Sequence, residues 1–373
     1  MIYLDSAATT LQKPRAVAKQ MARAVGRLSS PGRGGHAAAM RAADAAFSCR
    51  MLAADMFGVR EPENVVFTSN ATHGLNIAIK SLVKSGMRVL VSGYEHNAVM
   101  RPLKAIGADI VVASSELFEP EMAVFAFERK LRDADVVICN HVSNVFGYIL
   151  PVQRIARLCD ERGIPFILDA SQSAGVIDID LAQLCARFIA MPGHKGLYGP
   201  QGTGLLLCAE TPVGIMQGGT GSNSLSRDMP DFLPDALEAG THNMPGIIGL
   251  MQGMEFVHKR GAERIMEHER ELIRVASDGL TMLDRVRVYR SEHLFSQGGV
   301  VSFTVRDASC EQVGEELSRR GVAVRAGLHC APDAHRTAGT IDTGTIRVSV
   351  SAFNTKTEIC RFLDILRDIV AKI

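Results

Sequence analysis

The stretch Phe188-Ile189-Ala190-Met191-Pro192-Gly193-His194-Lys195 is the starting point, because a run of apolar residues leads directly into a lysine. An earlier stretch of the same form, Phe166-Ile167-Leu168-Asp169, ends in an aspartate. Short, continuously apolar runs are typical of strands that are covered by helices on both faces. The two stretches therefore predict a lysine and an aspartate at the ends of neighbouring strands of one sheet.

This pair of residues suggests a particular chemistry. A lysine at a strand end can form a Schiff base with a carbonyl cofactor, and an aspartate nearby can keep a pyridinium nitrogen protonated. Both are requirements of pyridoxal 5′-phosphate (PLP) chemistry. A surface lysine or a strand-end aspartate is common by itself, so the interpretation depends on the rest of the sequence.

The composition is that of an ordinary globular protein, with 373 residues, 47% of them hydrophobic and 22% charged. The length predicts a large domain with a smaller one. A net charge of +1 gives no basic surface for nucleic acid. We find no signal peptide and no run of about 18 apolar residues, so we expect no membrane partner and a cytoplasmic location.

The eight cysteines are scattered along the chain without a CxxC pair. This spacing indicates neither a disulfide framework nor a metal site. In a reducing compartment most of them should be buried as small hydrophobic residues.

The middle of the chain alternates short apolar runs with helical patterns, which predicts an α/β fold with a mainly parallel sheet. A loop segment rich in Gly, Ser, Asn and Pro follows at 214–245, and then a long helical stretch at 245–283. The C-terminal part predicts a small α+β domain. We assign 1–250 to the large cofactor-binding domain, with 1–15 able to pack against the small domain, and 251–373 to the small domain. The predicted strands are 65–67, 88–91, 109–112, 136–139, 166–168, 205–207, 300–305, one near Val322, and 345–350.

Polar clusters follow several of these strands. Because ligands bind beyond the carboxyl ends of the strands in parallel sheets, we expect the clusters to meet at one edge. They are Thr68–Gly74, Glu95-His96-Asn97, Ser143-Asn144, Asp169–Gln172 and His194-Lys195.

These clusters belong to a longer series of motifs, and through them the chain resembles a known family. It is similar to the class V PLP enzymes, specifically the cysteine desulfurases and selenocysteine lyases of the SUF-type (group II) branch. The resemblance implies PLP-dependent transferase fold type I, with a large mainly parallel-sheet domain and a smaller α+β C-terminal domain. The motifs are Tyr3–Thr10, Glu95-His96, Ser143–Gly147, Asp169-Ala170-Ser171-Gln172, Gly193-His194-Lys195, Leu197–Pro200, Glu238-Ala239-Gly240-Thr241, Arg325–Ala331, and Arg347 before Phe353-Asn354-Thr355.

The resemblance implies roles for the residues around the cofactor ring. Lys195 would bind PLP and then move the substrate Cα proton. Asp169 would pair with the ring nitrogen, His96 would stack on the ring, and Gln172 would meet the phenolic oxygen.

It also implies the residues that hold the cofactor phosphate. The N–H groups of the turn at Ala71, with Thr72 and His194, would hold it, and Thr241 from a partner subunit would complete the cup.

The substrate would be bound by a further set. Arg347 and Asn144 would bind its α-carboxylate, and Arg33 would reach the neighbouring subunit's site. The implied assembly is a homodimer with shared active sites.

Cys330 decides between reactions. It lies in a Gly-Leu-His-Cys-Ala-Pro loop beside His329 and between Arg325 and Arg336, a setting that favours a thiolate. A desulfurase needs such a thiolate to accept the substrate sulfur as a persulfide and pass it to an acceptor protein or a small thiol. The function expected is therefore conversion of L-cysteine to L-alanine, with Lys195, Cys330 and His96 as catalytic residues.

Three departures from the family pattern indicate a divergent subfamily. Asn70-Ala71-Thr72 replaces the usual Gly-Thr-Thr turn, Pro192 stands where serine is common, and Gly196 is an extra residue after the lysine.

Three alternatives stay open. A selenocysteine lyase would act on L-selenocysteine without needing Cys330. Another class V reaction, such as transamination or epimerisation, would leave Cys330 without a role. A non-catalytic scaffold would need none of these side chains, and their joint presence argues against it.

Overall fold

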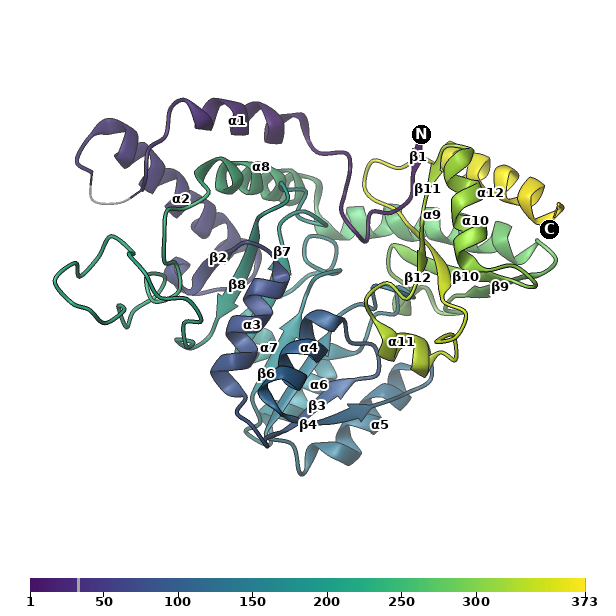
Figure 1. Ribbon diagram of the computed structural model, residues 1–373, viewed down its shortest axis with the longest axis horizontal. Coiled ribbons are helices and arrows are strands. Elements are labelled where there is room, and N and C mark those ends of the chain that lie inside the picture. The colour runs from purple at the N-terminus through teal and green to yellow at the C-terminus, as the bar shows by residue number, and fades with distance from the viewer. Residues whose placement is uncertain (32–33, 373) are drawn as a thin grey trace.

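The computed structural model describes residues 1–31 and 34–372 and contains three β-sheets (Figure 1). The largest has seven strands in the order β2-β8-β7-β6-β5-β3-β4. From β4 to β7 neighbouring strands are parallel, whereas β8 is antiparallel to β7 and β2. The predicted mainly parallel sheet is confirmed. Its strands are β2 (Val65–Thr68), β3 (Arg88–Ser92), β4 (Asp109–Ala113), β5 (Val136–Asn140), β6 (Phe166–Asp169), β7 (Phe188–Pro192) and β8 (Gly204–Cys208).

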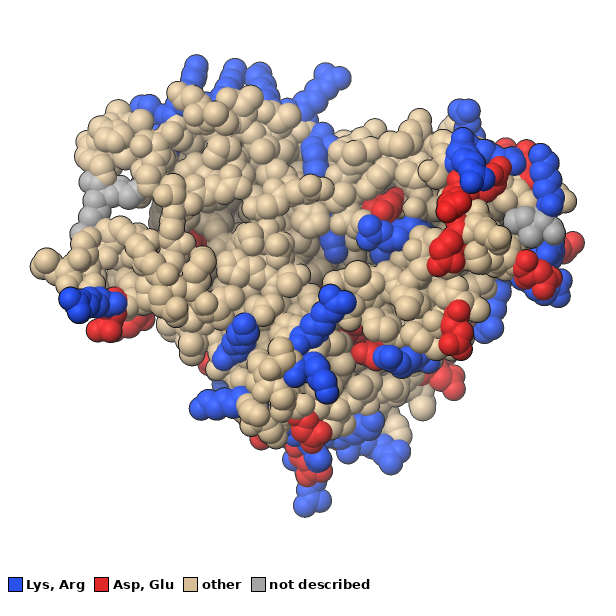
Figure 2. Space-filling model, in the orientation of Figure 1, with Lys and Arg blue, Asp and Glu red and all other residues tan. Residues whose placement is uncertain are grey.

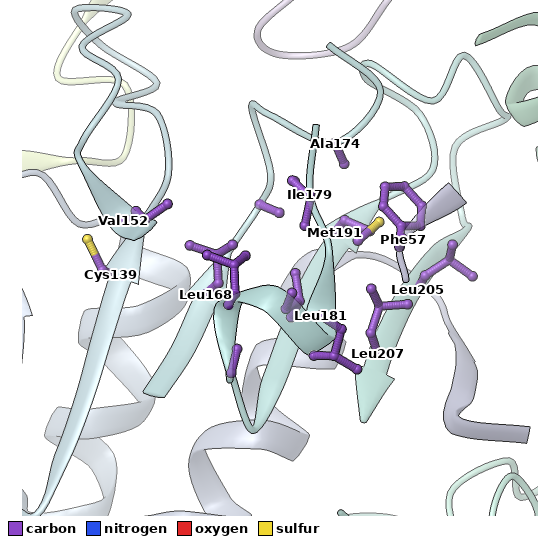
Figure 3. Packing of buried hydrophobic residues seen from close by; sticks show 14 of the residues in the cluster. Phe57, Cys139, Val152, Leu168, Ala174, Ile179, Leu181, Met191, Leu205 and Leu207 are labelled. Carbon is purple, nitrogen blue, oxygen red and sulfur yellow. The ribbon is translucent and has the colours of Figure 1, made fainter. Parts of the chain in front are cut away.

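The central strands β5, β6, β7 and β8 are buried on both faces, which explains why they are almost entirely apolar. Side chains alternate between the faces along a strand. Leu205 and Leu207 of β8 accordingly belong to one hydrophobic cluster and Leu206 to another. Figure 3 shows the first cluster, in which Leu168 and Met191 from the sheet pack with side chains from outside it.

Helices cover the two faces. The cluster on one face includes side chains of α3 and α4, and the cluster on the other includes side chains of α2, α5, α6, α7 and α8. The helices are α1 (Arg15–Val25), α2 (Ala37–Met56), α3 (Ala71–Leu82), α4 (Asn97–Ile106), α5 (Pro120–Leu131), α6 (Val152–Asp160), α7 (Leu181–Leu184), α8 (Met244–Arg260), α9 (Ala262–Thr281), α10 (Cys310–Arg319), α11 (Pro332–Thr337) and α12 (Lys356–Val370), with 3-10 turns at Pro62–Asn64 and Leu294–Ser296.

The C-terminal part has a separate four-stranded sheet in the order β12-β13-β10-β9. The chain's first strand, β1, pairs in parallel with β11, so both chain termini lie on this side of the molecule (Figure 1). Ile2 and Leu4 join the hydrophobic cluster formed by this sheet with α9, α10 and α12. The strands are β1 (Ile2–Tyr3), β9 (Val286–Tyr289), β10 (Val300–Val305), β11 (Val322–Ala323), β12 (Arg325–Gly327) and β13 (Thr345–Ser349).

The long helical stretch predicted for 245–283 was wrong in one respect. It consists of two helices, because Gly261 adopts a φ of +86° and ends α8 before α9 begins. The loop predicted for 214–245 is confirmed, since no helix or strand of the described residues lies between β8 and α8. The predicted domain division at 250/251 falls inside α8 and stays a prediction.

The charged side chains of the visible face are mixed in sign, except that basic side chains project from the edge formed by α1 (Figure 2). Within residues 1–31 and 34–372, no helix is long and apolar enough to cross a membrane. In the same ranges no cluster of three or more His, Cys, Asp or Glu side chains has the arrangement of a metal site.

Gly253 on α8 offers a test of the packing between this helix and the segment after Lys195. A Cβ atom at Gly253 would lie 2.2 Å from the carbonyl oxygen of Leu197, which is main chain and cannot rotate away. We expect Gly253→Ala to destabilise the protein by about 1–3 kcal/mol, measured as a lower denaturant midpoint. Gly26→Ala is the control, because no atom of the described part of the chain lies within 4 Å of a Cβ at that position. Equal midpoints for the two variants would contradict the close packing.

Candidate active site

A cavity at the carboxyl-terminal edge of the seven-stranded sheet brings together most of the predicted site residues. They come from segments that directly follow β2, β3, β5, β6 and β7. Parallel strands end at the same edge, which is why residues so far apart in sequence meet. The predicted residues that line the cavity are Ala71, Thr72, His96, Asn144, Asp169, Gln172, His194 and Lys195.

Asp169 is the buried acid of the cavity. It ends β6, where it pairs with Ala190 of β7, and only 4% of its surface is exposed. Its Oδ1 accepts a hydrogen bond from the Ser171 N–H at 2.9 Å. Among the described residues no donor binds Oδ2, so this oxygen is free for a cationic partner such as a protonated ring nitrogen.

Lys195 follows β7 and lines the same cavity. Burial lowers its pKa to about 8, an effect that Asp169 opposes and that the positive charge of Arg347 increases. A neutral amine is the form that attacks a carbonyl group, and this shift makes it available near neutral pH.

His96 caps the start of α4. Its Nδ1 accepts a hydrogen bond from the Ala98 N–H at 3.0 Å, which places the proton of the neutral ring on Nε2. Burial lowers the pKa of His96, and Lys195 acts in the same direction while Asp169 opposes both. The ring is therefore held in one orientation at the edge of the cavity.

Cys330 lies next to His96 through the main chain. The N–H of Asn97 donates a hydrogen bond to the Cys330 carbonyl at 2.8 Å. The Cys330 side chain is exposed, and both Cys330 (φ 56°) and His329 (φ 50°) adopt the left-handed conformation that non-glycine residues rarely take. His329 is buried, and its carbonyl accepts a hydrogen bond from Asn144 Nδ2 at 2.8 Å. These contacts fix the loop and leave the thiol on the outside.

Arg347 and Asn144 are also brought together. Arg347 is 1% exposed, and its Nη1 donates to the Asn144 carbonyl at 2.9 Å. Its Nη2 donates to Asp5 Oδ1 at 2.6 Å, while Nε has no hydrogen-bond partner within the described residues. Oδ2 of Asp5 also lies 3.7 Å from Nε of Arg325. A substrate carboxylate would therefore have to share Arg347 with Asp5 or displace it.

The start of α3 also lines the cavity. Asn70 caps the helix by accepting the His73 N–H at 2.9 Å, and Ala71 and Thr72 form the first turn. Such an end presents free N–H groups and the positive end of the helix dipole to an anion.

His194 is held by the N-terminal segment. Its Nδ1 lies 3.1 Å from Thr9 Oγ1, and its carbonyl accepts a hydrogen bond from Lys13 Nζ at 2.8 Å. Burial, with the charges of Lys195 and Lys13, lowers the pKa of His194 to about 4, so the ring is neutral at pH 7.

One predicted residue, Thr241, lies elsewhere. Thr241 is exposed and lines a different cavity with Phe67 and Glu238. Arg33 lies outside the described residues. Gln172 lines the main cavity, and its Nε2 donates to the Ala7 carbonyl at 3.0 Å.

Asp5, Lys13 and Glu95 were missed by sequence reasoning. Asp5 and Glu95 stand in quoted motifs but were given no role, and Lys13 had no signal beyond its position before Pro14. Glu95 is fully buried, and burial raises its pKa to about 8. Only the folded chain shows what these side chains contact.

The pairing of Asp5 with Arg347 can be tested by removing the acid. Asp5→Ala leaves a buried guanidinium without its anion, so we expect a loss of about 2–4 kcal/mol in the free energy of unfolding. Asp109→Ala is the control, because its pair with Arg88 is exposed and should change stability by less than about 1 kcal/mol. A similarly small loss of unfolding free energy in both variants would show that the buried Asp5–Arg347 pair does not contribute to stability.

The ionisation of Lys195 can be measured in the protein without cofactor. Since only the neutral amine reacts with an amine-directed reagent, labelling of Lys195 should rise with pH and level off above about 8. The control is free N-acetyl-lysine in the same solution, whose labelling should still be rising there because an unperturbed lysine has a pKa of about 10.4. Competitive labelling followed by mass spectrometry gives both pH profiles, and identical profiles would refute a lowered pKa of Lys195.

Comparison with known proteins adds independent findings. The model of the family aminotransferase class-V matches residues 2–362. The probable cysteine desulfurase of Pyrococcus abyssi is 30% identical, over 99% of this chain and 94% of that protein. That of Xylella fastidiosa strain 9a5c is 31% identical, over 97% and 89%.

Solved structures agree with these matches. The apo structure of cysteine desulfurase from Thermococcus onnurineus NA1 has a TM-score of 0.91 at 30% identity, covering 100% of this chain and 95% of that one. The cysteine desulfurase CsdA from Escherichia coli, as its S-sulfonic acid, has a TM-score of 0.87 at 26% identity, covering 100% and 94%. The fold is therefore PLP-dependent transferase fold type I, and the chain belongs to the aminotransferase class-V family.

Proposed function

We propose that this protein is a PLP-dependent cysteine desulfurase of the SUF-type (group II) branch. It would convert L-cysteine to L-alanine, hold the sulfur as a persulfide on Cys330 and pass it to an acceptor protein or a small thiol. The observation that carries the proposal is the position of Cys330. Its side chain is exposed, and its carbonyl accepts a hydrogen bond from Asn97, the residue after His96, which lines the cavity with Lys195.

The residues present fit PLP. Asp169 offers an unengaged carboxylate oxygen for the ring nitrogen, and the first turn of α3 offers N–H groups for the phosphate. Lys195 provides an amine of lowered pKa. When bound there, PLP supplies an electron sink for the bond electrons at the substrate Cα.

The side chains around the ring divide the remaining tasks. Asp169 would keep the ring nitrogen protonated, and Lys195 would remove and return the Cα proton. His96 would lie against the ring, and Gln172 would hold the phenolic oxygen.

Binding of phosphate and substrate uses the edges of the cavity. Thr72 and His194 would hold the phosphate, and in the proposed dimer Thr241 of the second subunit would complete this site. Arg347 and Asn144 would bind the α-carboxylate of the substrate. For this, the hydrogen bond between Arg347 Nη2 and Asp5 must first break.

Sulfur transfer is carried out by Cys330. Its thiolate attacks the substrate sulfur, forming an S–S bond as the C–S bond of the substrate breaks. The short loop supports the group II assignment, because only Leu328–Ala331 separate β12 from α11. An exposed Cys330 also suits delivery of sulfur to an acceptor.

The homodimer and the cytoplasmic location belong to the same proposal. Met40, Phe47 and Met51 are about half exposed and lie at spacings of one helical face on α2. This apolar stripe supports contact with a second subunit, which would bring the partner's Thr241 to the phosphate.

The test is an assay of the PLP-loaded protein with L-cysteine, following alanine and protein-bound persulfide. We expect Cys330→Ala to lower both by at least about 100-fold, because Cys330 is the thiol whose loop is bonded beside His96 at the cavity. Cys360→Ala is the matched control, since Cys360 is also exposed but lies on α12, and it should retain activity.

L-selenocysteine is assayed in parallel. Alanine from selenocysteine that survives in Cys330→Ala, with little activity on cysteine, would indicate a selenocysteine lyase instead. No alanine from either substrate would refute the desulfurase proposal and favour another class V reaction or a scaffold.

A further inference from the structure

A second, smaller cavity adjoins the candidate active site at Lys195. It measures about 40 Å³ and shares Lys195, Gln172 and Val142 with the candidate active site. One water molecule needs roughly 10–15 Å³ by this measure, so the cavity has room for about three or four waters and is too small for a substrate.

Two polar side chains without partners line this cavity. Glu269 on α9 is 6% exposed, and among the described residues no hydrogen bond or ion pair reaches its carboxyl group. A Cβ at Gly299 would lie 2.3 Å from its Oε2, so the carboxyl packs directly on a glycine. Ser6 Oγ is buried and also has no hydrogen-bond partner in residues 1–31 and 34–372. Buried polar atoms are nearly always hydrogen-bonded, so this cavity suits ordered water.

Few charges surround Glu269. Lys195 is the other charged side chain among the described residues that line the cavity, and Tyr198 contributes a phenol. On α9 itself, His268 and Arg270 donate to main-chain carbonyls of other segments. Burial therefore acts on Glu269 unopposed and raises its pKa to about 8.

We propose that Glu269 is a proton store for Lys195, to which it is connected by water held in this cavity with Ser6. Glu269 is then a positioning residue that does not touch the substrate. The protonated carboxyl gives its proton to the water and the water gives one to the Lys195 amine, which leaves a carboxylate and an ammonium. The reverse transfer restores the starting state.

The proton affinities of Glu269 and Lys195 suit this exchange. Burial raises the pKa of Glu269 and lowers that of Lys195, in both cases to about 8. Proton transfer between groups of matched pKa has little thermodynamic cost.

The need for a store follows from the proposed function, on which this part of the inference rests. L-Cysteine and the Cys330 thiolate give L-alanine and a persulfide anion. The Cα proton leaves and returns, and the proton of the substrate thiol must end on Cβ. Lys195 can carry one of these two protons at a time, so the site needs another group to hold the second.

The first experiment uses the apoprotein and does not depend on catalysis. The folded form of Glu269 binds a proton between about pH 4.5 and 8, whereas the unfolded form does not, so stability falls as pH rises through this range. Glu269→Gln removes this loss. Its melting temperature should exceed that of wild type by a margin that widens by about 3 °C or more from pH 5 to pH 8. Glu267→Gln, an exposed neighbour on α9, should show no such widening, and a constant margin for Glu269→Gln would overturn the inference.

The second experiment tests the connection to Lys195 without sulfur chemistry. The PLP-loaded protein is incubated with L-alanine in D₂O, and loss of the Cα proton signal is followed by NMR. We expect Glu269→Gln to slow the exchange about tenfold at equal cofactor occupancy, with Glu267→Gln unchanged. Ser6→Ala should slow it as well, and this variant serves if Glu269→Gln does not fold. Wild-type exchange rates in both Glu269→Gln and Ser6→Ala would refute the proton store.

The two proposals can fail separately. If the protein released no alanine from L-cysteine, the desulfurase proposal would fall, yet the apoprotein melting curves and the alanine exchange would still decide the role of Glu269.

Discussion

The parallel alignment of β5, β6 and β7 is the constraint on which the site depends. Backbone hydrogen bonds fix the register of these strands, with Asn140 opposite Asp169 and Asp169 opposite Ala190. Asp169 and the segment leading to Lys195 must therefore end at the same edge. Helices on both faces bury the sheet and keep this edge rigid, so that side chains beyond it are placed on a fixed platform.

Burial is the second organising influence, because it sets the protonation states. It lowers the pKa of Lys195 and His194 and raises that of Glu95 and Glu269, in each case disfavouring the charged form. Arg347 keeps its charge and instead is paired with Asp5. Near pH 7, Lys195 therefore has a larger neutral fraction than an exposed lysine, and Glu95 and Glu269 are mostly protonated, unlike exposed carboxyl groups.

Much of the fold could be predicted from the sequence. The strands of the large sheet were identified to within one or two residues, since a strand buried on both faces needs a continuous apolar run. β12 was missed because it is three residues long and depends on pairing with β13. β9 was missed because its arginine interrupts the apolar pattern. The break at Gly261 was missed because a helical pattern continues on both sides of it.

The sequence by itself determined the sheet, the convergence of the polar clusters on one edge, and the resemblance that singled out Lys195, Asp169 and Cys330. Such features depend on local patterns of apolar residues and on motifs that are contiguous in the chain. Only the tertiary structure decided that Asp5 forms an ion pair with Arg347 and that Glu269 lines a small cavity together with Lys195. It also decided that Thr241 lies away from the candidate active site of its own chain. These relations join segments that are distant in sequence, and burial and charge pairing act through space, so no local pattern encodes them.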